Sequence, residues 1–200
     1  MKSTIVTLDL EGVLVPEIWI AFAQKTGIKE LELTTREVPD YDVLMHGRLK
    51  ILDHHRLKLG DIQEVIGTLS PLEGAKDFLN ELRAITQVII LSDTFQEFAT
   101  PLMRQLDWPC IFCHNLEVQD GRIIGYRLRQ QNQKQKSVTA LKALNYQVIA
   151  AGDSFNDTTM LGEADHGFLF RSPSTIQQQF PQFEALEEYA ELFARIKERI

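Results

Sequence analysis

The pattern of apolar and polar positions divides the chain into a segment with helical spacing only and a part in which strands and helices alternate. A β-branched apolar run at residues 4–10 (TIVTLDL) reads as a buried strand. Between residues 17 and 70, apolar positions recur at helical spacing and no strand pattern occurs. From residue 72 onward, apolar runs such as 87–91 (QVIIL) and 147–151 (QVIAA) alternate with helical stretches. This alternation predicts a parallel sheet with helices on both faces.

The helical segment between residues 17 and 70 is expected to form a separate unit. Its expected helices are residues 17–26 closed by Gly27, a helix that follows Pro39-Asp40 and runs to about Leu57, and a helix after Gly60 with Asp61 as N-cap. Because this block contains no strand signal, we expect a small helical cap at residues 16–71. Residues 1–15 and 72–200 would then form the α/β core.

The alternating part, from residue 72 onward, supplies the remaining predicted elements. We expect helices at 74–83, 95–106, 136–144 and 185–200, and further strands at 110–113, 116–118, 123–128 and 166–170. Asp120-Gly121 lies between two of these strands and predicts a tight hairpin.

Composition and charge narrow the classes of function. The formal net charge is −7 and no basic stripe is present, which argues against nucleic acid as a partner. The N-terminal apolar run is interrupted by Asp9 and is too short for a signal peptide or a membrane span. We therefore expect a cytoplasmic protein without a membrane partner.

The cysteines give a misleading motif. Cys110, Cys113 and His114 match the spacing of covalent haem attachment, but that chemistry requires an exported protein. A zinc site would need further ligands at suitable spacing. We interpret this stretch as a short buried strand.

Polar clusters follow the first, second and third of the clearest strands: Asp9 with Glu11, Ser92-Asp93-Thr94, and Gly152 to Asp157. A single strand-end Asp is more often a helix cap. Parallel strands, however, bring their carboxyl ends to one rim, where converging carboxylates repel unless a cation lies among them. Oxygen ligands without His or Cys favour Mg²⁺.

These clusters carry a resemblance to a known family. The segments at 9–13 (DLEGV), 91–94 (LSDT) and 152–157 (GDSFND) resemble motifs I, II and IV of the haloacid dehalogenase superfamily. Over nearly the whole chain the resemblance is to the phosphoserine phosphatases, most of all to their bifunctional phosphoserine phosphatase/homoserine phosphotransferase branch. It implies a Rossmann-like doubly wound sheet with an inserted helical cap.

The resemblance implies roles for the acids. Asp9 would be the nucleophile that forms an aspartyl phosphate. Glu11 stands where the family usually has Asp, and would be the general acid and base as well as a metal ligand through its backbone carbonyl. Asp9, Glu11 and Asp153 would hold Mg²⁺, and Asp157 would support that site by contacting a ligand of the ion or a water bound to it.

Binding of the phosphoryl group would involve residues after the second strand and one lysine. Ser92 and Asp93 lie at the motif II position of the resemblance. Lys134 and Lys136 compete for the motif III role. Alignment of residues 127–130 (RLRQ) with the bifunctional branch favours Lys134, whereas Lys136 has the better position at the predicted helix start. Either lysine could instead be a solvated charge.

The cap supplies the substrate-binding candidates. Arg48 falls on the same helical stripe as apolar residues, either as a side chain at the stripe's edge or as the partner of a substrate carboxylate. Glu17 would meet a substrate ammonium or stabilise a helix start. Asn156 would donate to the substrate or hold its own loop.

Together these groups describe a receptor for a zwitterion beside a phosphate site. We expect a Mg²⁺-dependent phosphoserine phosphatase that also transfers the phosphoryl group to homoserine, within serine and threonine biosynthesis. The alternatives are a related phosphatase for another small phosphomonoester, a phosphate-accepting signalling domain, and a non-catalytic metabolite-binding protein. The sequence leaves the oligomeric state open, a homodimer included.

Overall fold

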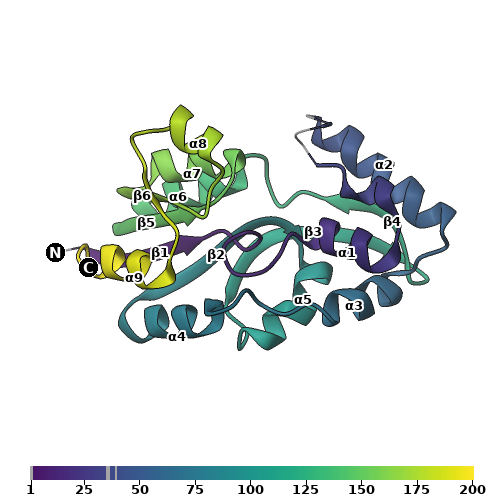
Figure 1. Cartoon of the computed structure of the whole chain (residues 1–200), viewed down its shortest axis with the longest axis horizontal. Helices are drawn as coiled ribbons and strands as arrows, with labels where there is room; N and C mark the ends of the chain where they lie inside the picture. The colour runs from purple at the N-terminus through teal and green to yellow at the C-terminus, as the bar shows by residue number, and fades with distance from the viewer. Residues whose placement is uncertain (1, 35–36, 39) are drawn as a thin grey trace.

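A seven-stranded sheet forms the centre of the computed structural model, which describes residues 2–34, 37–38 and 40–200 (Figure 1). The strand order is β4-β3-β2-β1-β5-β6-β7, and every pairing is parallel except that of β3 with β4. The strands are β1 (Ser3–Leu8), β2 (Gln87–Phe95), β3 (Cys110–Gln119), β4 (Arg122–Arg127), β5 (Tyr146–Gly152), β6 (His166–Phe170) and β7 (Glu184–Leu186).

Helices cover both faces of this sheet. On one side lie α4 (Ala75–Ile85), α5 (Gln96–Gln105) and α9 (Tyr189–Lys197), and on the other α6 (Gln133–Ala143), α7 (Thr158–Glu163) and α8 (Ser174–Gln179) (Figure 1). The doubly wound α/β fold predicted from the sequence is confirmed.

The alternation of strand side chains explains the two layers. In β5, Ile149 packs into the layer that holds α4, α5 and α9, whereas Val148 and Ala150 pack against α6 and α7. Both sets are fully buried, because successive side chains of a strand point to opposite faces. The centre of β5 is therefore apolar on both faces, and its polar residues follow at the carboxyl end.

The predicted cap segment contains four helical elements and, among its described residues, no strand. They are α1 (Ile18–Thr26), the 3₁₀ helix η1 (Lys29–Glu32), α2 (Tyr41–His54) and α3 (Leu59–Gly67). Trp19 of α1 packs edge-to-face on Phe98 of α5, with ring centroids 5.2 Å apart. The division into core and cap stays a prediction, although these helices do pack on one end of the sheet.

Several predicted boundaries were wrong. Helix α3 begins two residues before Asp61, whose carboxylate accepts the N–H of Lys58 at 2.8 Å from inside the first turn. Helix α6 begins at Gln133, three residues earlier than predicted. Helix α2 does begin after Asp40, as predicted; Asp40 is its N-cap and accepts the N–H of Val43, whereas Pro39 lies outside the described residues. It ends at His54, before the predicted Leu57.

The strands also differ from the prediction. Strand β2 continues past residue 91 to Phe95, and residues 110–119 form one continuous strand rather than two. The predicted last helix is shorter than expected. Residues 184–186 form strand β7 and pair with β6, and α9 begins only at Tyr189. Short extended segments of this kind carry too few residues for a periodic signal.

The predicted hairpin joins β3 to β4 and touches the cap segment. Asp120 and Gly121 adopt φ of 51° and 79°, the left-handed values that a two-residue hairpin loop requires. The N–H of Leu59 donates to the Gly121 carbonyl at 2.8 Å. Two further contacts join helix α2 to β4: Arg122 with Asp53, and the Tyr126 hydroxyl with Asp42.

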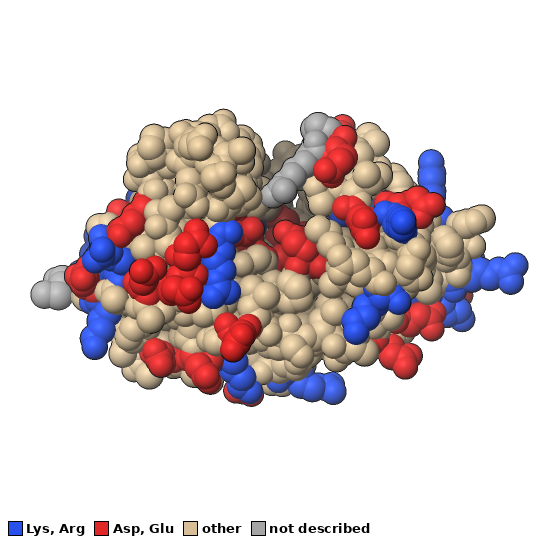
Figure 2. All heavy atoms as spheres, viewed as in Figure 1, with Lys and Arg blue, Asp and Glu red and all other residues tan. Residues whose placement is uncertain are grey.

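The surface is mixed in charge. On the face drawn in Figure 2, Lys and Arg alternate with Asp and Glu, and acidic atoms are visible in the hollow between the α8 side and the α2 side. None of the helices in the described part of the chain combines the length and apolarity needed to cross a membrane.

Candidate active site

Asp9 lies directly after β1, in the middle of the sheet. Its N–H donates to the carbonyl of Ala151 on the neighbouring β5 at 3.0 Å, and its carboxylate accepts the N–H of Leu10 at 2.8 Å. The side chain is buried, with 5% of the residue exposed. Burial, and next the charge of Asp157, raise the pKa of Asp9 well above its ordinary value, although Lys134 opposes them.

Three acids converge at this end of the sheet. Carboxylate oxygens of Asp9, Asp153 and Asp157 lie within 4.8 Å of one another. Burial and the charge of Asp157 raise the pKa of Asp153 to about 7. The Oδ1 atom of Asp153 is buried and has no hydrogen-bond partner among the described residues. A buried cluster of oxygens with one unpartnered atom fits a small divalent cation such as Mg²⁺.

Gly12 permits this close approach. It has a φ of 79°, and a Cβ atom placed on it would lie 2.4 Å from the Oδ2 atom of Asp153. A side chain here would therefore displace an acid of the cluster. The requirement for glycine comes from a neighbour 141 positions away in the sequence, which no local pattern reveals.

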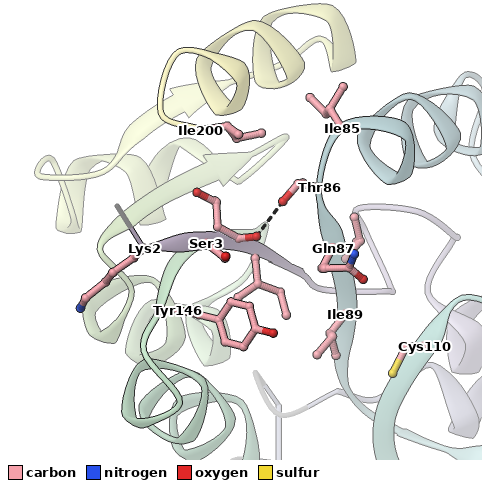
Figure 3. Close-up of a pocket in the computed structure, with 12 residues that line it drawn as sticks. Lys2, Ser3, Ile85, Thr86, Gln87, Ile89, Cys110, Tyr146 and Ile200 are labelled. Carbon is pink, nitrogen blue, oxygen red and sulfur yellow. Dashed lines mark hydrogen bonds between the residues drawn. The ribbon is translucent and has the colours of Figure 1, made fainter.

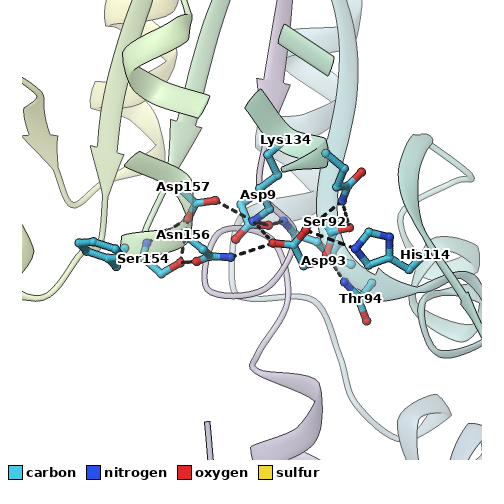
Figure 4. Close-up of polar contacts among 12 residues, drawn as sticks. Asp9, Ser92, Asp93, Thr94, His114, Lys134, Ser154, Asn156 and Asp157 are labelled. Carbon is cyan, nitrogen blue, oxygen red and sulfur yellow. Dashed lines mark hydrogen bonds and ion pairs between the residues drawn. The ribbon is translucent and has the colours of Figure 1, made fainter. Parts of the chain in front are cut away.

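Lys134 is the cation among these acids. Its buried Nζ lies 2.7 Å from the Oδ1 of Asp157 and 2.8 Å from the Oδ1 of Asp9. Burial lowers the pKa of Lys134, but the charges of Asp157 and Asp9 outweigh it and raise the pKa well above its ordinary value. The competing Lys136 is exposed on α6. The structure thus brings Lys134, and not Lys136, to the acids (Figure 4).

Asp157 holds the loop after β5. Its Oδ2 accepts the N–H of Asp153 at 3.1 Å, the N–H of Ser154 at 3.0 Å and the hydroxyl of Ser154 at 3.0 Å. Its Oδ1 pairs with Lys134, and the residue is fully buried. Asp157 therefore connects the loop that carries Asp153 to the lysine that contacts Asp9.

Glu11 faces the start of the predicted cap segment. Its Oε2 accepts the N–H of Ile18, the first residue of α1, at 2.8 Å. Burial, and next the charge of Glu17, raise the pKa of Glu11 to about 8. This rise favours the protonated carboxyl, which is the form that can donate a proton.

Ser92 and Asp93 lie within β2, which continues beyond them. The buried Ser92 Oγ accepts the N–H of Thr94 at 3.2 Å, and the Ser92 carbonyl accepts the side-chain amide of Gln133. The Asp93 carboxylate accepts from Gln133 Nε2 at 3.2 Å and from Asn156 Nδ2 at 3.1 Å. Burial would raise the pKa of Asp93, but Lys134 and these hydrogen bonds lower it below its usual range.

Arg48 is buried in the cap segment rather than at its edge, with 7% of the residue exposed. Its Nη2 donates to the Leu33 carbonyl at 2.7 Å, and its guanidinium lies 4.4 Å from the centre of the Trp19 ring. Its buried Nε has no hydrogen-bond partner in the described part of the chain. Burial lowers the pKa of Arg48 to about 10, against the charges of Glu11, Tyr41 and Glu17.

Glu17 is exposed immediately before α1. It occupies the N-cap position, but its side chain makes no capping hydrogen bond. Its charge acts on both Glu11 and Asp153, which places it electrostatically near the acid cluster. Asn156, also exposed, contacts Ser154 through its side-chain oxygen and Asp93 through its amide.

Sequence reasoning missed two residues at this site, Gln133 and His114. Both are buried, with exposures of 2% and 3%. His114 lies 3.6 Å from the Asp93 carboxylate, yet in the sequence it stood out only through the misleading cysteine pattern. Gln133 precedes Lys134, but a glutamine in a polar run carries no signal of its own.

A separate hollow lies at the opposite, amino-terminal ends of the strands. It has a volume of about 660 Å³ and is lined by residues such as Ser3, Gln87, Cys110 and Tyr146 (Figure 3). Lys2 is the one charged residue among its described lining residues. Ligands of open parallel sheets bind at the carboxyl ends, so the acid cluster is the better candidate for an active site.

Comparisons with known proteins agree with this placement. A family model of haloacid dehalogenase-like hydrolases matches residues 4–165. The phosphoserine phosphatase ThrH of Pseudomonas aeruginosa is 63% identical over 94% of this chain and 92% of its own length. A phosphoserine phosphatase of Pseudomonas syringae pv. tomato is 61% identical over 94% of this chain and 80% of its own length.

Solved structures share the fold at low sequence identity. An apo phosphoserine phosphatase has a TM-score of 0.76 at 19% identity and covers 94% of this chain and 95% of its own. A phospho-aspartyl intermediate analogue of phosphoserine phosphatase also has a TM-score of 0.76, at 18% identity, over 98% and 99% of the two chains. By fold, family model and close relatives, the chain belongs to the haloacid dehalogenase-like hydrolases.

Proposed function

We propose that the protein is a Mg²⁺-dependent phosphoserine phosphatase that works through an aspartyl phosphate on Asp9. The observation that carries the proposal is the buried contact of Asp9 with Lys134, beside Asp153, at the carboxyl end of the sheet. Two relatives above 60% identity bear the name phosphoserine phosphatase, which supports the choice of substrate.

The reaction requires a nucleophile and one proton donor. An oxygen of Asp9 forms a bond to phosphorus while the bond from phosphorus to the serine oxygen breaks, and Glu11 gives its proton to that oxygen. In the second half, Glu11 takes a proton from water as the water oxygen bonds to phosphorus and the Asp9–phosphorus bond breaks. The raised pKa of Glu11, about 8, suits both directions of transfer.

Charge on the phosphoryl oxygens is balanced by fixed groups. Lys134 is held between Asp157 and Asp9 and needs no rearrangement to meet a phosphoryl oxygen. The Ser92 hydroxyl accepts the N–H of Thr94, which leaves its own proton for donation to the phosphoryl group. Asp93 and Asn156 keep this side of the site in place through their hydrogen bond.

The residues present fit Mg²⁺ as cofactor. Asp9 and Asp153 would hold it through carboxylate oxygens and Glu11 through its backbone carbonyl, while Asp157 supports Asp153 from behind. When bound, the ion would supply positive charge that polarises the phosphoryl group and lessens repulsion of the Asp9 carboxylate.

The amino-acid part of the substrate would meet the cap segment, residues 16–71. Arg48 would bind the carboxylate through its Nε, which has no partner among the described residues, and the exposed Glu17 would bind the ammonium group. A sugar phosphate offers neither charge. Homoserine has the same amino-acid head and a hydroxyl, so we propose it as a second phosphoryl acceptor in place of water. Phosphoserine and homoserine would place the enzyme in serine and threonine biosynthesis, in the cytoplasm.

A panel of phosphomonoesters tests this function. Phosphoserine, a sugar phosphate and p-nitrophenyl phosphate are incubated with Mg²⁺ or with EDTA, with and without homoserine, and products are followed by phosphorus NMR. We expect phosphoserine to be the preferred substrate, EDTA to stop turnover, and a homoserine phosphate signal to appear. Equal rates with EDTA would refute the metal-dependent mechanism, and a preference for the sugar phosphate would refute the substrate.

A further inference from the structure

His114 is a buried histidine at the edge of the candidate site, and it belongs to none of the three motifs that carry the family resemblance. Its Nδ1 accepts the backbone N–H of Arg129 at 3.0 Å. Because a peptide N–H can only donate, Nδ1 carries the lone pair and the ring proton resides on Nε2. That Nε2–H faces the Oδ1 of Asp93 at 3.6 Å, just beyond hydrogen-bond length (Figure 4).

Asp93 is a meeting point for several elements. Its carboxylate accepts from Asn156 of η2 (Phe155–Asp157) at 3.1 Å and from Gln133 of α6 at 3.2 Å, and one oxygen lies 4.0 Å from the Lys134 Nζ. Its backbone carbonyl accepts the hydroxyl of Tyr41, in the predicted cap segment, at 3.3 Å. The orientation of this one side chain therefore bears on Asn156 and Lys134 together.

We propose that His114 is a positioning residue for the phosphoryl-transfer reaction: its Nε2–H attracts and orients the Asp93 carboxylate, which in turn accepts the hydrogen bond of Asn156 and places a negative charge 4.0 Å from Lys134. The inference rests on the proposed function. It assigns His114 no contact with substrate or metal. Its effect passes through Asp93, as outer residues do when they orient the ligands of a reactive centre.

A packing role is the competing explanation. The His114 ring centroid lies 6.4 Å from that of Phe95, and the side chain fills space beneath the hairpin. Packing depends on the volume of the side chain, whereas positioning depends on a donor at the Nε2 place. Two substitutions separate these roles because they retain different atoms of the ring.

His114→Asn places an oxygen where Nδ1 was and can still accept from Arg129, but it does not reach Asp93. His114→Gln carries an amide nitrogen the same number of bonds from Cα as Nε2 and reaches Asp93. We expect the Asn variant to lose kcat by about tenfold, with little change of KM, and the Gln variant to recover most of it. The factor should be equal for phosphoserine and p-nitrophenyl phosphate, since Asp93 serves the phosphoryl group common to both.

Melting temperature and a matched variant complete the experiment. His55→Asn makes the same substitution at an exposed histidine of the cap segment and should change nothing. Wild-type kcat in the Asn variant, or equal losses in the Asn and Gln variants that follow their melting temperatures, would overturn the inference. If the wild type hydrolyses p-nitrophenyl phosphate but not phosphoserine, the substrate assignment fails, while the comparison of the two variants still decides the role of His114.

Discussion

The two ends of the candidate site are built differently. At the phosphoryl end, the buried Lys134 pairs with both Asp9 and Asp157, at 2.8 and 2.7 Å. At the cap end, Arg48 keeps a buried Nε without a partner among the described residues, and Glu17 stands exposed without a capping bond. The proposed nucleophile and its lysine are thus held by ion pairs, whereas the capacity for a ligand lies in the Asp153 Oδ1 at one end and in Arg48 and Glu17 at the other.

This difference has an expected consequence for mutation. Changes at the phosphoryl end should reduce the turnover of every substrate, because all phosphomonoesters share that group. Changes at the cap end should alter the ranking of substrates and leave simple ones unaffected. Each of the following measurements tests one side of that contrast.

Asp9→Asn should have the largest effect. It removes the proposed nucleophile but keeps the size of the side chain, so we expect turnover of all substrates to fall by more than about 10⁴-fold. Phosphate release measures the loss, and circular dichroism establishes that the fold is retained. Substantial activity in a folded Asn variant would remove Asp9 from the role of nucleophile.

Lys134→Ala should follow. A fixed donor at the developing charge is worth about 10²–10³-fold in kcat, and the loss should be the same for phosphoserine and p-nitrophenyl phosphate. Lys136→Ala, two residues along the same helix at an exposed position, is the matched control and should be neutral. Comparable losses in both variants would mean that charge on α6, rather than the contact with Asp9, matters.

Arg48→Ala should sharpen the contrast from the other side. We expect kcat/KM for phosphoserine to fall by about 10–100-fold, as for the loss of a charge-assisted hydrogen bond, with p-nitrophenyl phosphate affected little. Steady-state kinetics on both substrates gives the ratio, and Arg104→Ala at an exposed position of α5 serves as control. Equal losses on the two substrates would indicate a structural role for Arg48.

The smallest effect concerns stability and pH. Asp153 has a pKa of about 7 and Glu11 of about 8 in the folded, metal-free protein, whereas both ionise near 4 when unfolded. Folding therefore takes up protons at intermediate pH, and this contribution to stability is complete below about pH 4 and is lost as the pH rises through 7 and 8. Binding of Mg²⁺ to the ionised carboxylates should offset the loss.

Thermal melting with EDTA or Mg²⁺, at about pH 6 and about pH 8, checks this prediction. Mg²⁺ at a hundredfold excess over its Kd stabilises by about 2.7 kcal/mol, and the gain in Tm should be greater at the higher pH. In Asp153→Asn the gain should shrink at both values. A gain that does not depend on pH would mean that these carboxyls are already ionised before the metal binds.

The sequence predicted the sheet and its acids better than the contacts between distant elements. Asp9, Ser92 and Asp153 were found because strand ends and parallel topology are encoded locally, in apolar runs followed by polar residues. The start of α6 was placed three residues late: its N-cap is Asn132, a residue type that favours helix starts, but the residues between it and Lys136 carry no apolar period. That error is why Lys136 remained a rival to Lys134.

Other features of the site depend on residues far apart in the chain. The exposure of Glu17, the burial of Arg48 against Trp19, and the contact of His114 with Asp93 are set by how helices and strands pack, and no spacing rule encodes them. Gly12 is similar, because the atom that forbids a side chain there belongs to Asp153. The convergence of the strand-end acids was thus predictable, whereas the contacts of Arg48 and His114 were not.

The hairpin of β3 and β4 has a mechanical consequence. It is attached to α2 and α3 through Tyr126, Arg122 and the Gly121 carbonyl, while β3 also carries His114 beneath Asp93. Helices α2 and α3 are therefore not free to move independently of the hairpin. Any outward movement of these helices that admits substrate must bend the hairpin or break these three contacts. Movement of the hairpin would then affect both the entry of substrate and, through His114 and Asp93, the alignment of the phosphoryl site.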